Sequence, residues 1–178
     1  MPNVACQPSS RPSQADAPLT GYGRALVEAI SHHVLVLDLA HMNRRGFSEC
    51  LEVHRGPVVV SHTGVAGAHE LWRNVTAEQA RAVADRGGVV GIIFFPAFLR
   101  GGLRGSITDV VDHIDAAVDA AGIDHVALGS DFDGGITLPD PMRDATDLVL
   151  LTDAMLRRGY TPEHCLMVLG ANALRVVG

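Results

Sequence analysis

The stretch VLVLDLAH at residues 34–41 decides the fold class of the chain. Five of its first six side chains are apolar, and such a nearly continuous run is typical of a strand that is buried on both faces of a parallel sheet. Three later runs have the same character: PVVVS at 57–61, GVVGIIFF at 88–95 and VALG at 126–129. Apolar spacing and capping signals predict helices around these strands, at 22–32, 45–54, 76–86, 106–121, 145–158 and from Thr161 onward.

Strands that alternate with helices predict an α/β fold with a parallel sheet and right-handed crossovers. A doubly wound open sheet and a (β/α) barrel of TIM type both fit this order. No G-x-G-x-x-G follows any of the runs, so nothing supports a dinucleotide-binding sheet. A complete barrel needs at least ~200 residues, and four β–α units are half of one. Residues 1–18 are rich in Pro, Ser and Gln, and we expect a disordered leader there.

Composition narrows the functional classes. The chain has 14 basic and 20 acidic residues, a net charge of −6, and every basic residue is Arg. An acidic chain without lysine argues against a nucleic-acid partner and excludes Schiff-base catalysis. Its three cysteines are far apart and form no C-x-x-C, so a disulfide framework and a thiolate zinc site are not expected. This cysteine usage, and the absence of an apolar run of ~18 residues, predict a cytoplasmic protein without a transmembrane segment.

Polar side chains follow three of the four predicted strands. His41 comes after the first, His62 after the second and Asp131 after the fourth. The carboxyl ends of parallel strands meet at one edge of the sheet, where ligands and reactions sit in such folds. Two imidazoles and a carboxylate at that edge suit a divalent cation, with zinc as the leading candidate. The alternative is that each histidine is a hydrogen-bonded loop residue.

Other polar residues receive weaker assignments. Arg73, in the loop after the second strand, can either clamp a carboxylate with two hydrogen bonds or cap a surface loop. Neither Ser61 nor Ser130 lies in a G-x-S-x-G elbow, so a serine hydrolase is not expected. His113 stands beside an aspartate on an amphipathic helix and is expected on the solvated surface. The same expectation, on a loop or helix surface, holds for His54, His69 and His164.

Several ordered motifs resemble those of the zinc dipeptidases known as membrane or renal dipeptidases, and the resemblance covers their C-terminal half. His62 follows His41 by 21 residues, and Arg73 and Asp131 follow His62 by 11 and 69. The motifs are LDLAH at 37–41, SHT at 61–63, RNVT at 73–76, GVVG at 88–91, GSDFDG at 129–134, LRRGY at 156–160 and GANALRV at 170–176.

The resemblance implies a (β/α) barrel whose two zinc ions are bridged by a glutamate, and hydrolysis of dipeptides by metal-activated water. It implies that His41 and His62 bind the second zinc. It further implies that Arg73 binds the terminal carboxylate of the substrate. Asp131 would handle the proton of the scissile bond or the amine of the substrate. We therefore expect residues 19–178 to be the C-terminal half of a metallo-dipeptidase barrel.

Three departures from the family pattern concern the other metal. An H-x-D pair occurs only at 113–115, inside a helix pattern, and neither the bridging glutamate nor the substrate-contacting histidine of the first half has a counterpart. A truncated half-barrel should leave strand edges and an apolar inner face uncovered, so we expect self-association or pairing with a missing N-terminal half. Two alternatives stay open: an inactive relative with a weak two-histidine metal site, and another metal-dependent amidohydrolase.

Overall fold

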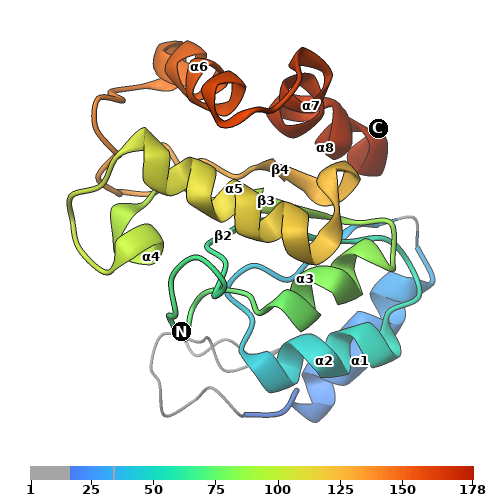
Figure 1. The fold of residues 1–178 in the computed structure, drawn as a ribbon. Helices are drawn as coiled ribbons and strands as arrows, with labels where there is room; N and C mark the ends of the chain where they lie inside the picture. Colours follow the sequence, from blue (N-terminus) through green and yellow to red (C-terminus); the bar gives the residue numbers. More distant parts are fainter. Residues whose placement is uncertain (1–16, 34) are drawn as a thin grey trace.

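The computed structural model describes residues 17–33 and 35–178 of the 178-residue chain. Strands and helices alternate along it (Figure 1). The strands are β1 (Leu37–Asp38), β2 (Val58–Thr63), β3 (Val89–Ile92) and β4 (Val126–Leu128), and the α-helices are α1 (Gly21–Ser31), α2 (Arg44–Val53), α3 (Ala77–Ala84), α4 (Pro96–Arg100), α5 (Ile107–Ala121), α6 (Leu148–Arg158), α7 (Pro162–Leu166) and α8 (Asn172–Val177). The leader predicted at 1–18 lies outside the described residues except for its last two positions, and it stays a prediction.

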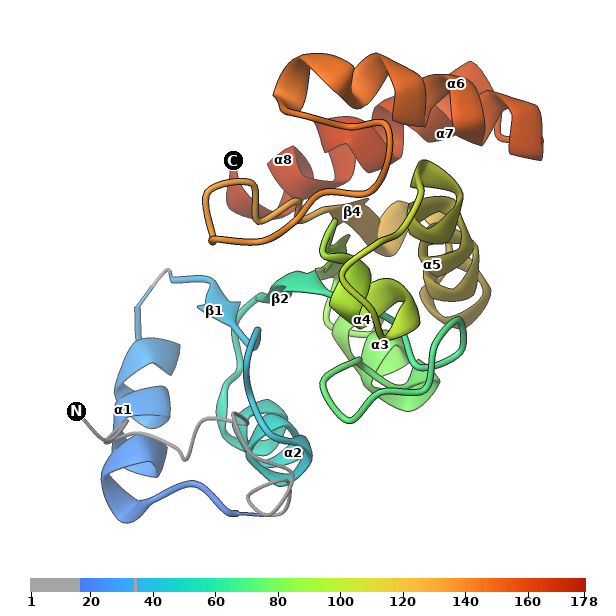
Figure 2. The ribbon, with the colours of Figure 1, turned by 90° about the vertical axis from the view of Figure 1, so that its left-hand side faces the viewer.

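The four strands form one parallel sheet in the order β1-β2-β3-β4. Val59 stands opposite Val89, and Val90 stands opposite Val126. The strands follow an arc, with α2, α3 and α5 on its outer side (Figure 2). The predicted alternation of parallel strands with helices is therefore confirmed.

The outer face of the sheet forms the main core with the helices. Because side chains alternate along a strand, every second residue points to this face. The residues on it are at most 1% exposed, namely Val58, Val60, Val90, Ile92 and Val126. This explains the apolar runs that predicted the strands.

The inner face of the sheet is covered near the start of its strands. Val59, Val89 and Ala127 are 9%, 5% and 3% exposed, and Ala173 and Val176 of α8 pack against them. The expectation of an uncovered apolar inner face is wrong for these residues, because α8 folds back over them. A cavity of about 200 Å³ remains beside them, lined by Val59, Val60, Ser61, Val89, Gly91, Ala127, Leu128, Ala173 and Val177.

The first residue of α8 holds this helix in place. Asn172 is 4% exposed, and its Nδ2 donates to the carbonyls of Ile123 and Val126 at 2.7 and 2.8 Å. The first carbonyl belongs to the helical turn Ile123–His125 that precedes β4, and the second belongs to the first residue of β4. The side chain thus ties the C-terminal helix to the amino end of the sheet.

Two helix starts follow the predicted capping chemistry. Thr76 accepts from the amide of Gln79, whose side chain accepts from the Thr76 amide in return, which is a capping box. Thr161 caps α7 through His164 N–H, and Pro162 occupies the first turn.

The first strand and one helix differ from the prediction. The run at 34–39 contributes only Leu37–Asp38 to β1, which lies at the edge of the sheet and, among the described residues, pairs with β2 alone. Position 34 of that run is not among the described residues. Helix α4 was not predicted; it begins at Pro96, shortly after β3, and is capped by Gly101 with φ 80°.

His54 is buried, not on a loop or helix surface as expected. It is 0% exposed, and its Nδ1 and Nε2 lie 2.9 Å from Ser31 Oγ and 3.2 Å from the carbonyl of Pro57. Both ring nitrogens therefore have partners inside the protein. The residue joins the end of α1 to the turn before β2 and has a structural role.

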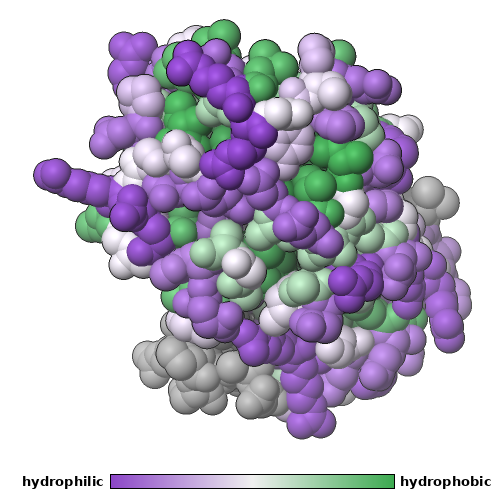
Figure 3. All heavy atoms as spheres, viewed as in Figure 1, coloured by the Kyte–Doolittle hydropathy of each residue, from purple (hydrophilic) through white to green (hydrophobic). Residues whose placement is uncertain are grey.

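Hydrophilic side chains cover most of the face seen in Figure 3, with hydrophobic side chains in separate patches. Large apolar residues are more than a third exposed on the three C-terminal helices, namely Val149, Leu156, Leu166, Leu174 and Val177. Among the described residues, no helix combines the length and apolar character needed to cross a membrane.

Candidate metal and carboxylate site

His41 and His62 meet at the carboxyl edge of the sheet. Their Nε2 atoms are 2.7 Å apart, and the rings meet edge to face with centroids 4.7 Å apart. His62 belongs to β2, whereas His41 follows β1 with a φ of 64°. A positive φ is uncommon outside glycine and tends to occur at functional sites. The structure thus brings together the two histidines that the sequence singled out.

Arg73 lies against this pair. Its Nη2 donates to Nδ1 of His41 at 2.5 Å. The guanidinium carbon lies 5.1 Å from the ring centre of Phe98 and 5.8 Å from that of Trp72. Burial lowers the pKa of Arg73 below its usual value, but a guanidinium stays charged at any physiological pH.

These contacts fix the proton positions on neutral rings. Arginine can only donate, so Nδ1 of His41 accepts and its Nε2 carries the proton. His41 then donates to Nε2 of His62, whose Nδ1 donates to Ser61 Oγ at 2.9 Å. Burial, followed by the charge of Arg73, lowers the pKa of His41 and keeps its ring neutral near pH 7. One directed chain of hydrogen bonds therefore runs from Arg73 to Ser61.

Asp38 ties the ends of the first two strands together. Its Oδ1 accepts from the amides of Ala40 and Ser61, both at 3.0 Å. The first bond shapes the turn that leads to His41, and the second holds β2 one residue before His62. Asp38 thus sets the spacing of the two histidines, a role that the sequence motif alone did not indicate.

Glycines let three strands come close beneath the pair. A Cβ on Gly91 would lie 2.2 Å from the carbonyl oxygen of Ser61, and one on Gly129 would lie 2.0 Å from the same atom. Any larger residue would push β3 or β4 away from β2. The close approach brings the end of β4, where Asp131 follows, toward the histidines.

Asp131 lies on the same edge but not in the hydrogen-bonded chain described above. It has a φ of 60°, and its carboxylate folds over its own turn, since a Cβ on Gly134 would lie 2.2 Å from Asp131 Oδ1. Its negative charge opposes the lowering of the pKa of His41. The carboxylate therefore acts on the pair through space.

The donor set fits part of a divalent cation site. Two imidazole nitrogens converge, and Ser61 orients the ring of His62 from behind, as outer partners of metal-bound histidines do. Zinc sites in proteins carry three or four protein ligands. Within 17–33 and 35–178, however, no three His, Cys, Asp or Glu side chains gather closely enough to hold a metal ion.

Two further buried polar residues hold the loop that carries Arg73, one within the loop and one on α5. Asn74 and His113 are 2% and 1% exposed. The expectation that His113 lies on the solvated surface is wrong, because its ring turns inward from α5 and hydrogen-bonds to Val65 and Leu99. Neither residue was assigned a role from the sequence, because their partners are mainly backbone atoms of other segments.

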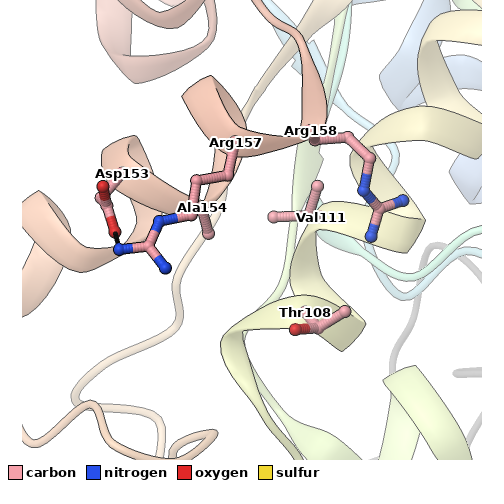
Figure 4. A pocket seen from close by; sticks show the side chains of 6 residues that line it. All are labelled: Thr108, Val111, Asp153, Ala154, Arg157 and Arg158. Atoms are coloured by element: carbon pink, nitrogen blue, oxygen red, sulfur yellow. Dashed lines mark ion pairs between the residues drawn. The ribbon is translucent and has the colours of Figure 1, made fainter.

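Larger cavities lie away from this edge. One of about 380 Å³ lies between α5 and α6 (Figure 4). Arg157 and Arg158 point in different directions there, and both are paired, the first with Asp153 and the second with Asp112 and Asp115. Since both arginines are already paired with carboxylates, the cavity does not offer a second charged site.

Several known proteins are similar to this chain in sequence and in fold. The chain is 39% identical over 163 residues to an uncharacterized protein in the pqqA 5′ region of Klebsiella pneumoniae, aligning 89% of this chain with 60% of that protein. It is 33% identical over 164 residues to an uncharacterized dipeptidase of Schizosaccharomyces pombe, aligning 90% with 39%. A metallopeptidase of Rhodobacter sphaeroides, solved with a phosphinate mimic of the dipeptide L-Ala-D-Ala, has a TM-score of 0.85 at 31% identity.

That superposition covers 92% of this chain and 48% of the other, so the chain spans about half the length of this relative. Its parallel α/β fold thus matches about half of the TIM-barrel-like structure of these enzymes, as predicted. The sequence model of the membrane dipeptidases matches residues 3–178. This match begins 16 residues before Leu19, where the dipeptidase-like region was expected to begin. The chain belongs to the membrane dipeptidase family, peptidase family M19.

Proposed function

We propose that this chain contains two histidine ligands for one metal ion and the arginine that binds the substrate carboxylate in a zinc-dependent dipeptidase site. His41 and His62 would hold the cation through their Nε2 atoms, with the proton of the His41 ring moved to Nδ1 and Arg73 released from that atom to bind the free carboxylate of a dipeptide. Asp131 handles the proton of the scissile bond. The observation that carries this proposal is the direct contact of Arg73 with the histidine pair.

The residues divide the work by their chemistry. A guanidinium next to the metal ligands pairs with a substrate carboxylate by parallel hydrogen bonds and fixes its distance from the cation. Only a very short peptide then has its amide bond at the cation. A divalent cation bound there polarises the carbonyl and lowers the pKa of its water. Asp131 takes the proton that the attacking water releases and returns it to the leaving amine.

A second candidate is a half-barrel relative that binds a cation weakly and does not turn over dipeptides. It is favoured by the finding that only two donors converge among the described residues. The family resemblance assigns the remaining ligands to an H-x-D pair and a glutamate without counterparts here. Both candidates share the histidine pair, so they differ in activity and in the number of bound ions.

Zinc titration of the purified full chain, followed by a dipeptide hydrolysis assay, tests both. We expect about one zinc per chain, lost in His62→Ala and kept in His33→Ala, a matched control at an exposed position of the described structure. Equal zinc binding by wild type and His62→Ala would contradict the metal assignment. Zinc binding without turnover would favour the second candidate.

The carboxylate assignment has its own control. Where turnover occurs, Arg73→Gln should raise KM for a dipeptide about tenfold or more, because a charge-assisted pair is lost. It should leave the hydrolysis of the corresponding C-terminal amide unchanged. A matching loss with both substrates would contradict the role of Arg73.

We further propose a cytoplasmic location, supported by cysteines that form no pairing pattern, two of which, Cys50 and Cys165, are buried free thiols.

A further inference from the structure

The segment at 64–75, which carries Arg73, is fastened at its base by a histidine from another helix. The amide of Val65 donates to His113 Nδ1 at 2.8 Å, and His113 Nε2 lies 3.0 Å from the carbonyl of Leu99. His113 lies on α5 and is 1% exposed. One buried ring thus joins the loop after β2 to helix α4.

The partners of His113 define its tautomer. Because Val65 N–H is a donor, Nδ1 must accept, and the proton sits on Nε2, where it is donated to Leu99. Both ring nitrogens are then satisfied in the neutral form. A ring whose two positions are both used by backbone atoms holds those two backbone segments at a fixed separation.

The bond at Val65 reaches Arg73 by a short path. Val65 forms a parallel bridge with Val75, which lies two residues after Arg73, and the Val75 amide donates to the Gly64 carbonyl at 3.0 Å. Asn74 closes the segment from inside, with Nδ2 donating to the carbonyls of His69 and Phe98, both at 2.9 Å. The two residues that follow Arg73 are therefore held to the base of the segment.

The bond at Leu99 fixes the support on the other side. Leu99 follows Phe98, whose ring centre lies 5.1 Å from the guanidinium carbon of Arg73. A cation over an aromatic face is stabilised by the ring, and more strongly where water is partly excluded. The two bonds of His113 therefore fix the base of the segment at 64–75 and the position of the Phe98 ring, against which Arg73 packs.

We propose that His113 is a positioning residue for Arg73 and thereby for recognition of a substrate carboxylate. The carboxylate part rests on the function proposed above, whereas the positioning of Arg73 does not. His113 touches neither the histidine pair nor a substrate. It acts through Val65 and Leu99.

Two conservative variants separate its two bonds. His113→Asn keeps an acceptor at the place of Nδ1 and loses the donor to Leu99, whereas His113→Gln keeps the donor at the place of Nε2 and loses the acceptor for Val65. Hydrogen–deuterium exchange should show loss of protection at Val65 and across 71–75, by about tenfold or more, in His113→Gln. His113→Asn should stay within about threefold of wild type at Val65, since that bond is kept.

The position of Arg73 has a second, independent measurement. The rate at which phenylglyoxal modifies Arg73 can be compared by mass spectrometry with that of Arg157, an internal reference that is 80% exposed. We expect faster modification of Arg73 in both His113 variants and in Phe98→Leu. The Phe98→Leu substitution should leave the exchange protection at Val65 unchanged. The proposal would be overturned if His113→Gln kept both the wild-type exchange rate at Val65 and the wild-type modification rate of Arg73. Equal exchange rates at Val65 in the two His113 variants would also overturn it.

Dipeptide kinetics then test the carboxylate part. His113→Gln should raise KM for a dipeptide about fivefold or more with little change in kcat, and should not affect the C-terminal amide. A normal loop exchange in His113→Gln defeats the positioning role, whereas disturbed exchange in a chain without any dipeptide turnover defeats the proposed function alone. A uniform loss with both substrates would indicate a general structural role and would overturn the carboxylate part.

Discussion

Removing the side-chain amide of Asn172 should destabilise the protein strongly, although the residue lies six positions from the end of the chain. In Asn172→Ala, the buried carbonyl of Val126 loses the Asn172 Nδ2 donor, whereas the carbonyl of Ile123 keeps the Val126 amide as a donor. An unsatisfied buried carbonyl costs ~1–3 kcal/mol, so we expect the free energy of unfolding to fall by about 1–3 kcal/mol. For a domain of this size, that corresponds to a decrease in Tm of about 2–12 °C.

Urea unfolding monitored by circular dichroism measures this loss, and dye binding reports whether the inner face opens. Leu174→Ala is the matched control on the same helix, because Leu174 is 67% exposed and should change the stability by less than ~0.5 kcal/mol. Asn172→Asp should behave like the alanine variant, since a carboxylate accepts and cannot donate. A free energy of unfolding within ~0.5 kcal/mol of wild type in Asn172→Ala would refute the role of α8 as the cover of the inner face.

Three further outcomes follow from the same structure. Burial lowers the pKa of His113 from 6.5, so the unfolded state takes up its proton first. The free energy of unfolding should therefore not depend on this residue above pH 6.5 and should decrease as the pH falls below 6.5. Urea titrations at several pH values should show a shallower decrease in His113→Asn. Gly91→Ala should lower the free energy of unfolding, measured by urea titration, by more than ~1 kcal/mol, because its Cβ would lie 2.2 Å from the carbonyl oxygen of Ser61. A free energy of unfolding equal to that of wild type would contradict the close approach of the strands. Within the part of the chain that the structure describes, β1 and β4 each have a strand on one side only, and such edges should promote self-association. Light scattering should therefore give masses above 18.8 kDa as the concentration rises, and a monomer at all concentrations would contradict this expectation.

The histidine pair could be predicted from the sequence because it depends on a simple rule. His41 and His62 both follow apolar runs, and the carboxyl ends of parallel strands lie side by side. The spacing of the runs thus contains enough information to bring the two rings together. The contact of Arg73 with His41 was not predicted, since a loop arginine has many possible partners and the family resemblance assigned Arg73 only to a substrate carboxylate.

His113 and Asn74 could not be placed in the same way. His113 stands beside Asp112 in an amphipathic pattern, and its partners Val65 and Leu99 are backbone atoms 48 and 14 residues away. Backbone groups are present at every position and leave no sign in the residue pattern. A buried histidine that bonds only to backbone therefore has the same sequence signature as a surface histidine.

The cover over the inner face was missed for a related reason. An apolar sheet face in a half-barrel suggests a second half, but Ala173 and Val176 of α8 already bury its lower part. Those side chains are small, and α8 has an exposed Leu174 between them, so its pattern does not single out a buried face.

This division of the inner face bears on how the site could act. The amino end of the sheet is closed by α8, whereas the histidine pair and Arg73 lie at the opposite, carboxyl end. The anchors of the arginine loop, His113 and Phe98, come from α5 and α4 within the same chain. The contacts described for the proposed carboxylate-binding arginine, those with Phe98, Trp72 and His41, come from these four β–α units, whereas the cation depends on donors beyond the pair. Carboxylate recognition and metal loading are for this reason separable properties, and measuring them independently distinguishes a working dipeptidase site from a relative that only binds.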